Sequence, residues 1–88
     1  MKDIKYFSAY TAPQIDNTFV GNRIKQLRVE NGLKVSDLQS IFGFEAPNAI
    51  YNWESGKSIP NISNLIVLRE LYELKSIDTI LFGEKKCS

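Results

Sequence analysis

The segment from Gly43 to Lys57 limits the possible folds of this chain more than any other part of the sequence. It holds a glycine at position 43, a proline at position 47 and a second glycine at position 56. Glycine commonly follows the last turn of a helix, and proline suits the first turn, where its missing N–H would have no partner. The segment therefore predicts a turn followed by a short helix over residues 47–55.

The predicted helix has two different sides. Helical spacing places one group of residues toward a core: Ala46, Ala49, Ile50 and Trp53. The opposite side is polar but uncharged: Asn48, Tyr51, Asn52 and Ser55. Most solvated helix faces are rich in Lys and Glu, so an amide face suggests a partner with matching hydrogen-bonding edges. An Asn side chain presents one donor and one acceptor, which fits the major-groove edge of adenine.

The size of the chain allows one small domain. Its 88 residues, of which 43% are hydrophobic, provide for one core and leave no room for a second ligand-binding domain. There are 11 Lys and Arg residues against 10 Asp and Glu, which is much less basic than many nucleic-acid-binding proteins. Between residues 21 and 60 the net charge is also only +1. Any electrostatic attraction to DNA should accordingly be weak, with a shallow salt dependence.

Several function classes are disfavoured by composition. There is no histidine and only one cysteine, Cys87. An internal disulfide, a cysteine–histidine nucleophile pair and the usual zinc site are therefore excluded. The N-terminal residues contain no apolar run long enough for a signal peptide or a membrane span. We expect a cytoplasmic protein that is not an enzyme, without a metal, a cofactor or an evident small-molecule site.

Apolar spacing predicts two helices before the segment 43–57. The first begins after a cap at Asp16 or Asn17, stops at Asn31 and carries Val20, Ile24 and Leu27. The second begins near residue 34, ends at Gly43 and turns four residues inward: Val35, Leu38, Ile41 and Phe42. Together with the helix at 47–55, this gives two short helices joined by a glycine-containing turn, a helix-turn-helix.

Two more helices are predicted after the segment. Asn61 or Ser63 caps the fourth helix, whose apolar residues cover a wide arc: Ile62, Leu65, Ile66, Leu68, Leu71 and Tyr72. Such an arc indicates burial on more than one side, so we expect this helix to be the central one. Ser76 caps a short last helix, closed by Gly83, with Ile77, Ile80, Leu81 and Phe82. The sequence thus predicts an all-α fold, a compact five-helix bundle over residues 17–83.

The two ends of the chain are predicted to lie outside this bundle. Residues 1–16 fit neither helical nor strand spacing, and we interpret them as a short N-terminal arm. Its aromatic residues either pack on the domain, or the arm enters a DNA groove or exchanges between two copies: Tyr6, Phe7 and Tyr10. Residues 84–88 form a polar tail.

Three runs of residues within the predicted bundle form a specific set. The run Arg23-Ile24-Lys25-Gln26-Leu27-Arg28 is followed by Asn31-Gly32-Leu33 and later by Ile50-Tyr51-Asn52-Trp53-Glu54-Ser55-Gly56-Lys57-Ser58-Ile59-Pro60. In these runs, and over about residues 19–83, the chain resembles the helix-turn-helix domains of phage repressor and Cro proteins, the XRE type of bacterial transcriptional regulator. The resemblance implies a lambda-repressor-like DNA-binding fold.

The resemblance also implies roles for single residues. In such proteins the second helix of the motif enters the major groove and the first lies across the DNA backbone. This implies base contacts from Asn48, Tyr51 and Asn52, although both asparagines could instead be solvated residues or local caps. Phosphate contacts are implied, partly through backbone N–H groups, for Lys34, Ser36, Gly56, Lys57 and Ser58, with Arg23 and Lys25 as weaker candidates. A buried ion pair is implied for Arg28 and Glu54, and the core anchors are Leu38, Ile50 and Trp53.

The chain departs from the family pattern at three places. Val35 stands where many members have a glutamine that binds a phosphate. The turn before the helix at 47–55 is one residue longer than usual, which puts Pro47 where a polar, base-contacting residue is common. Glu45, at the tip of this turn, would repel a phosphate unless it caps the helix.

Two functions of different classes are compatible with the sequence. The leading hypothesis is a sequence-specific regulator of transcription that binds double-stranded DNA as a homodimer, with half-sites roughly 34 Å apart. The alternative is a protein-interaction module on the same fold, such as an antitoxin-like or antirepressor partner. Four residues of the last helix are our candidate dimer contact, unless they simply close the bundle: Ile77, Ile80, Leu81 and Phe82.

Overall fold

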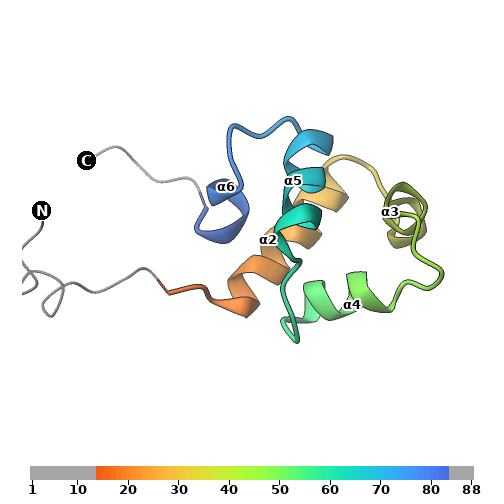
Figure 1. Ribbon diagram of the computed structural model, residues 1–88, viewed down its shortest axis with the longest axis horizontal. Helices are drawn as coiled ribbons and strands as arrows, with labels where there is room; N and C mark the ends of the chain where they lie inside the picture. The colour runs from red at the N-terminus through yellow and green to blue at the C-terminus, as the bar shows by residue number, and fades with distance from the viewer. Residues whose placement is uncertain (1–13, 84–88) are drawn as a thin grey trace, which may run out of the picture.

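The computed structural model describes residues 14–83, and within them the chain forms five α-helices (Figure 1). In chain order these are α2 (Asn17–Glu30), α3 (Val35–Phe42), α4 (Asn48–Ser55), α5 (Ile62–Leu71) and α6 (Asp78–Leu81). The prediction of an all-α fold with five helices is confirmed for this part of the chain. No helix in it has the length and apolar character needed to span a bilayer. Most of the predicted arm and the whole predicted tail lie outside the described residues.

α2 begins and ends where its capping residues predict. The Asp16 carboxylate accepts hydrogen bonds from the backbone N–H groups of Thr18 (2.9 Å) and Phe19 (3.3 Å). These are donors that the first turn of a helix leaves without partners. At the other end, the side chain of Asn31 donates to the carbonyl oxygen of Leu27 (2.7 Å). The buried side of α2 carries the three residues that spacing predicts: Val20, Ile24 and Leu27.

α3 is fixed at its start by Asp37, whose carboxylate accepts a hydrogen bond from the backbone N–H of Lys34 (2.7 Å). It ends at Gly43, where φ is 72°, a left-handed conformation that glycine adopts at little cost. Leu38 is fully buried, but Ile41 is 45% exposed, so the prediction that Ile41 points inward is wrong. The core side of α3 is centred between Leu38 and Phe42, and Ile41 lies beyond its edge.

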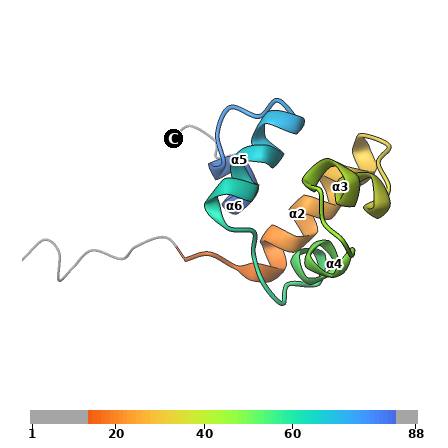
Figure 2. The same ribbon diagram turned by 45° about the vertical axis from the view of Figure 1, so that its right-hand side comes forward.

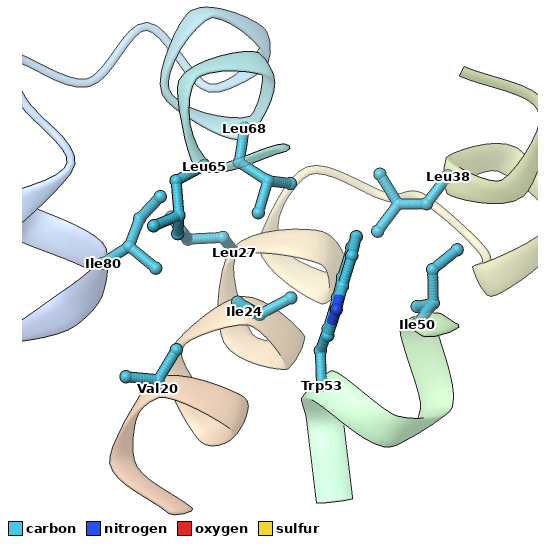
Figure 3. Packing of buried hydrophobic residues seen from close by; sticks show 9 residues of the cluster. All are labelled: Val20, Ile24, Leu27, Leu38, Ile50, Trp53, Leu65, Leu68 and Ile80. Atoms are coloured by element: carbon cyan, nitrogen blue, oxygen red, sulfur yellow. The ribbon is translucent and has the colours of Figure 1, made fainter. Parts of the chain in front are cut away.

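α2 is the central helix of the bundle. On one side of it, α3 and α4 contribute Leu38, Ile50 and Trp53 to the core (Figure 3). On the other side, α5 and α6 contribute Leu65, Leu68 and Ile80. The prediction that the fourth helix is central is therefore wrong, because both halves of the core meet on α2.

α5 is buried on one side only. Asn61 caps it as predicted, since its side-chain oxygen accepts a hydrogen bond from the backbone N–H of Asn64 (2.9 Å). Leu65 and Leu68 are buried, whereas Ile62 is 61% exposed and Ile66 is 41% exposed. The wide apolar arc thus does not mean burial on two sides, because no element within residues 14–83 covers the outer part of α5.

α6 is a single turn that closes the bundle against α2. The hydroxyl of Ser76 accepts a hydrogen bond from the backbone N–H of Asp78 (3.2 Å). The cap position of α6 is however occupied by Ile77, without a side-chain cap hydrogen bond, so the prediction that Ser76 is the cap is wrong by one residue. Ile80 is fully buried. The prediction that Ile80 belongs to a dimer surface is therefore wrong, because its side chain is used by the core of its own chain.

Candidate functional site

α3 and α4 are joined by residues 43–47, and the two helices pack against each other (Figure 2). Two short consecutive helices with a glycine in the turn between them form a helix-turn-helix. α4 begins at Asn48, with Pro47 directly before it. Ala46 is exposed, so the prediction that it faces the core is wrong. It lies in the turn, where helical spacing does not yet apply.

The outer side of α4 is exposed and uncharged. It carries the four residues that spacing places there: Asn48, Tyr51, Asn52 and Ser55. Tyr51 is 56% exposed. Neither asparagine caps α4, because Pro47 occupies the cap position and no side chain forms a cap hydrogen bond there. The two amides are therefore on the surface, each with donors and an acceptor to offer a partner.

The main chain of α4 lies close to α2 at Gly21. A Cβ atom at this position would overlap the carbonyl oxygen of Trp53 and lie 2.9 Å from that of Glu54. Glycine weakens a helix interior relative to alanine, and the close approach explains why it stands here. Reasoning from the sequence missed Gly21. The available signal was a glycine inside an otherwise helical pattern, which often marks a packing constraint.

An ion pair between Arg28 and Glu54 joins α2 to the end of α4. Nε and Nη2 of the guanidinium donate to the two carboxylate oxygens at 2.7 and 3.1 Å, and Nη1 donates to the Leu33 carbonyl oxygen at 3.0 Å. The side chains of Arg28 and Glu54 are 12% and 9% exposed. The hydrogen bond to Glu54 raises the pKa of Arg28, and burial opposes that shift. Because a bidentate pair has a fixed geometry, it holds α4 in one orientation against α2.

Tyr72 lies close enough to this ion pair for the three groups to affect one another. Its hydroxyl oxygen is buried and has no hydrogen-bond partner in the described part of the chain. Burial raises the pKa of Tyr72 to about 12, against the opposing effect of the Arg28 charge. The phenol is therefore neutral at physiological pH and adds no charge beside the pair.

A surface hollow of about 590 Å³ lies beside the outer side of α4. Residues of α2, α3, α4 and the following loop line it: Lys25, Arg28, Val35, Tyr51, Asn52, Glu54, Ser55 and Lys57. Arg28 is neutralised by Glu54, so the positive charge available to an anion here comes from Lys25 and Lys57. Sequence reasoning made Lys25 only a weak candidate. Its place beside Lys57 depends on the packing of α2 against α4, which no local pattern encodes.

The backbone N–H groups after α4 are not available to a phosphate. The N–H of Gly56 donates to the carbonyl oxygen of Trp53 (3.2 Å), and those of Lys57 and Ser58 donate to that of Asn52 (2.9 and 3.3 Å). The expectation that these N–H groups bind an anion is therefore wrong. The C-terminal turn of α4 has carbonyl oxygens without helical partners, and these N–H groups satisfy them.

The other predicted phosphate contacts, Lys34 and Ser36, are exposed at the start of α3. They do not line the hollow. The carboxylate of Asp37 already accepts a hydrogen bond at this helix end. A negative charge there stabilises the helix but reduces the attraction for an external anion.

Comparison with known proteins identifies the family from its sequence. No curated protein and no solved structure gave a significant match. A family model described as a helix-turn-helix domain matches residues 21–85, which include α3, the turn and α4. This match covers most of the chain, and the fold agrees with it. The chain therefore belongs to a helix-turn-helix domain family.

Proposed function

We propose that this protein is a sequence-specific, double-stranded-DNA-binding regulator of transcription, of the phage repressor and Cro (XRE) type. α4 would enter the major groove, and α3 would lie across the DNA backbone, as in other helix-turn-helix proteins. One observation carries the proposal: a short helix held rigidly from behind exposes two amides and a phenol on its outer side. Membership of a helix-turn-helix family supports DNA as the partner.

The proposed base contacts are Asn48, Tyr51 and Asn52. An Asn side chain forms two hydrogen bonds with adenine, and each such pair contributes about 1–3 kcal/mol of discrimination against a wrong base. The outer side of α4 has no Lys or Arg, the usual partners of guanine. We therefore expect the preferred site to contain adenines at the positions that face α4.

The proposed phosphate contacts are Lys57 and Lys25, which both line the hollow beside α4. The hydroxyl of Ser58 and the side chains of Lys34 and Ser36 are secondary candidates. With so few cations, the dependence of DNA affinity on salt concentration should be shallow, since each neutralised phosphate adds only about 0.9 to the logarithmic slope.

We also propose that two copies bind one operator. Three residues of the predicted dimer contact are only partly buried and remain candidates for that contact: Ile77, Leu81 and Phe82. Sedimentation of the protein with and without a DNA site tests this. A single copy on a site that lacks inverted repeats would contradict it.

A second candidate function is a protein-interaction module with weak DNA binding. Glu45 is exposed in the turn beside α4, and Asp37 adds a carboxylate at the start of α3. Both groups would repel a DNA backbone. Purification of a stoichiometric protein partner after nuclease treatment would favour this function.

The proposed function is tested by selecting duplexes from a random pool with the purified protein at low salt. We expect enrichment of one short motif. The double variant Asn48→Ala, Asn52→Ala should lose the selected site, whereas Asn22→Ala should retain it, because Asn22 is an exposed asparagine of α2 that does not line the hollow beside α4. No enrichment by the wild type, or equal binding by the double variant, would contradict the proposal.

A further inference from the structure

The connection between α3 and α4 contains an aromatic residue, Phe44, that belongs to neither helix. Gln39 forms hydrogen bonds with both the N–H and the carbonyl group of Phe44. The N–H of Phe44 donates to the carbonyl oxygen of Gln39 (3.0 Å), and the side-chain amide of Gln39 donates to the carbonyl oxygen of Phe44 (3.3 Å). The path of the turn is therefore fixed by hydrogen bonds as far as Phe44.

The ring of Phe44 belongs to an aromatic cluster of three rings, formed with Phe42 and Trp53. The rings of Phe42 and Phe44 are stacked, with centroids 5.1 Å apart and 9° between their planes. Trp53 meets both of them edge to face, with centroids 5.3 Å from Phe42 and 5.9 Å from Phe44. Such contacts prefer defined geometries. The cluster thus ties the last residue of α3 and the turn to the inner side of α4.

The two ends of α4 are held in different ways. The C-terminal end is held against α2 by the close approach at Gly21 and by the ion pair of Glu54. The N-terminal end has no side-chain cap hydrogen bond. Glu45 and Ala46, which lead into it, are exposed. Its position therefore depends on the buried Ile50 and on the path that the aromatic cluster gives to the turn.

We propose that Phe44 is a positioning residue for the base contacts of α4. The inference rests on the proposed function and adds to it a residue that touches no DNA. Removal of the ring leaves the two hydrogen bonds between Gln39 and the main chain of residue 44 but removes the contact of the turn with Trp53 on the inner side of α4. The N-terminal end of α4, which carries Asn48, then shifts relative to α2. A displaced amide loses its two-bond geometry with a base, whereas Lys25 and Lys57 still attract phosphates. Phe44 therefore controls the ratio of specific to non-specific affinity.

The test measures this ratio on the duplex that the wild type selects and on a scrambled duplex of the same composition, at one salt concentration. Phe44→Leu keeps an apolar side chain but removes the stacking with Phe42. It should lower the ratio of specific to non-specific affinity about tenfold, the loss expected when one amide no longer forms its two hydrogen bonds with a base. Phe44→Ala should lower it at least as much. Phe44→Tyr keeps the ring, and its ratio should stay within about twofold of the wild type, as for other mild substitutions.

Phe19→Ala is the matched control, because Phe19 is an aromatic residue of α2 outside the aromatic cluster and is 40% exposed. Circular dichroism at the assay temperature establishes that each variant is folded, and Phe44→Leu serves if Phe44→Ala unfolds. If Phe44→Leu leaves the ratio unchanged, whether affinity for both duplexes stays the same or falls equally, the positioning role of Phe44 is overturned. The proposed function is not affected by that outcome. If the wild type selects no site, the proposed function fails and this inference fails with it.

Discussion

The inner side of α4 packs against α2, α3 and the turn, whereas the residues of its outer side are exposed to solvent. The inner side combines a main-chain contact at Gly21, the Arg28–Glu54 ion pair and the ring of Trp53. The outer side is made of uncharged polar groups, with Asn48 and Asn52 as its amides. The inner side of α4 thus fixes the position of the helix, and the outer side carries the polar groups that a partner would contact. Substitutions on the inner side should change stability, and those on the outer side should change binding alone.

The largest effect is expected for Trp53→Ala. Trp53 is 4% exposed and contacts two other rings, so its truncation removes apolar burial and leaves a cavity. The free energy of unfolding should fall by about 3–5 kcal/mol, which a domain of this size can barely withstand. Urea denaturation followed by circular dichroism measures it. A loss below about 1 kcal/mol would mean that the inner side is not the main support of α4.

A smaller loss is expected for Arg28→Ala. The variant strands the Glu54 carboxylate at a site where the side chain is only 9% exposed. Because both side chains keep some contact with solvent, we expect the free energy of unfolding to fall by about 3 kcal/mol, near the lower limit for buried pairs. Arg69→Ala is the control, since the Arg69–Glu70 pair is 3.6 Å long and its side chains are 35% and 69% exposed. That exposed pair should contribute less than about 1 kcal/mol. Equal losses in the two variants would remove the distinction between the pairs.

On the outer side, the single variants Asn48→Ala and Asn52→Ala should each weaken binding to the selected duplex by about 1–3 kcal/mol. Their urea midpoints should match that of the wild type within the scatter of surface substitutions, about 0.5 kcal/mol. Titration of labelled duplexes and denaturation of the same samples provide both values. A variant that loses stability and binding in parallel would contradict the separation of the two sides.

The smallest effect at neutral pH is expected for Tyr72→Phe, which removes a buried hydroxyl without a hydrogen-bond partner in the described residues. The folded-state pKa of Tyr72 is about 12, and the unfolded value is about 10. Below pH 10 the phenol is protonated in both states and stability does not depend on it. As pH rises from 10 to 12, the unfolded state loses the proton first, so stability falls. Urea midpoints should decline less steeply over this range in Tyr72→Phe than in the wild type.

Helix existence and helix ends were predictable from local chemistry. Asp16 and Asn61, each one of two predicted cap candidates, accept the cap hydrogen bonds of their helices, and Gly43 adopts the left-handed conformation that ends α3. These features depend on a few neighbouring residues, so a single sequence contains the information. The exposure of the outer side of α4 was predictable for the same reason, because helical spacing relates it directly to the buried Ile50 and Trp53.

The extent of burial was not predictable in this way. Helical spacing places Ile62 and Ile66 with the apolar residues of α5, and Ile41 with those of α3. It does not say how much of each apolar side a neighbouring helix covers, and all three residues are exposed. The hollow that Lys25 and Lys57 both line was missed because it forms only when α2 and the loop after α4 are placed together. The use of the Ser58 N–H by the Asn52 carbonyl was missed likewise, because local N–H groups can satisfy either a helix end or an anion.

The contact at Gly21 is made with main-chain carbonyl groups of α4, and no outer side chain takes part in it. Exchange of the side chains at positions 48, 51, 52 and 55 should therefore leave this contact between α2 and α4 unchanged. On the proposed function, related regulators are free to diverge in the operators they bind while inheriting one scaffold. A library randomised at these four positions is accordingly a source of new specificities that should remain folded.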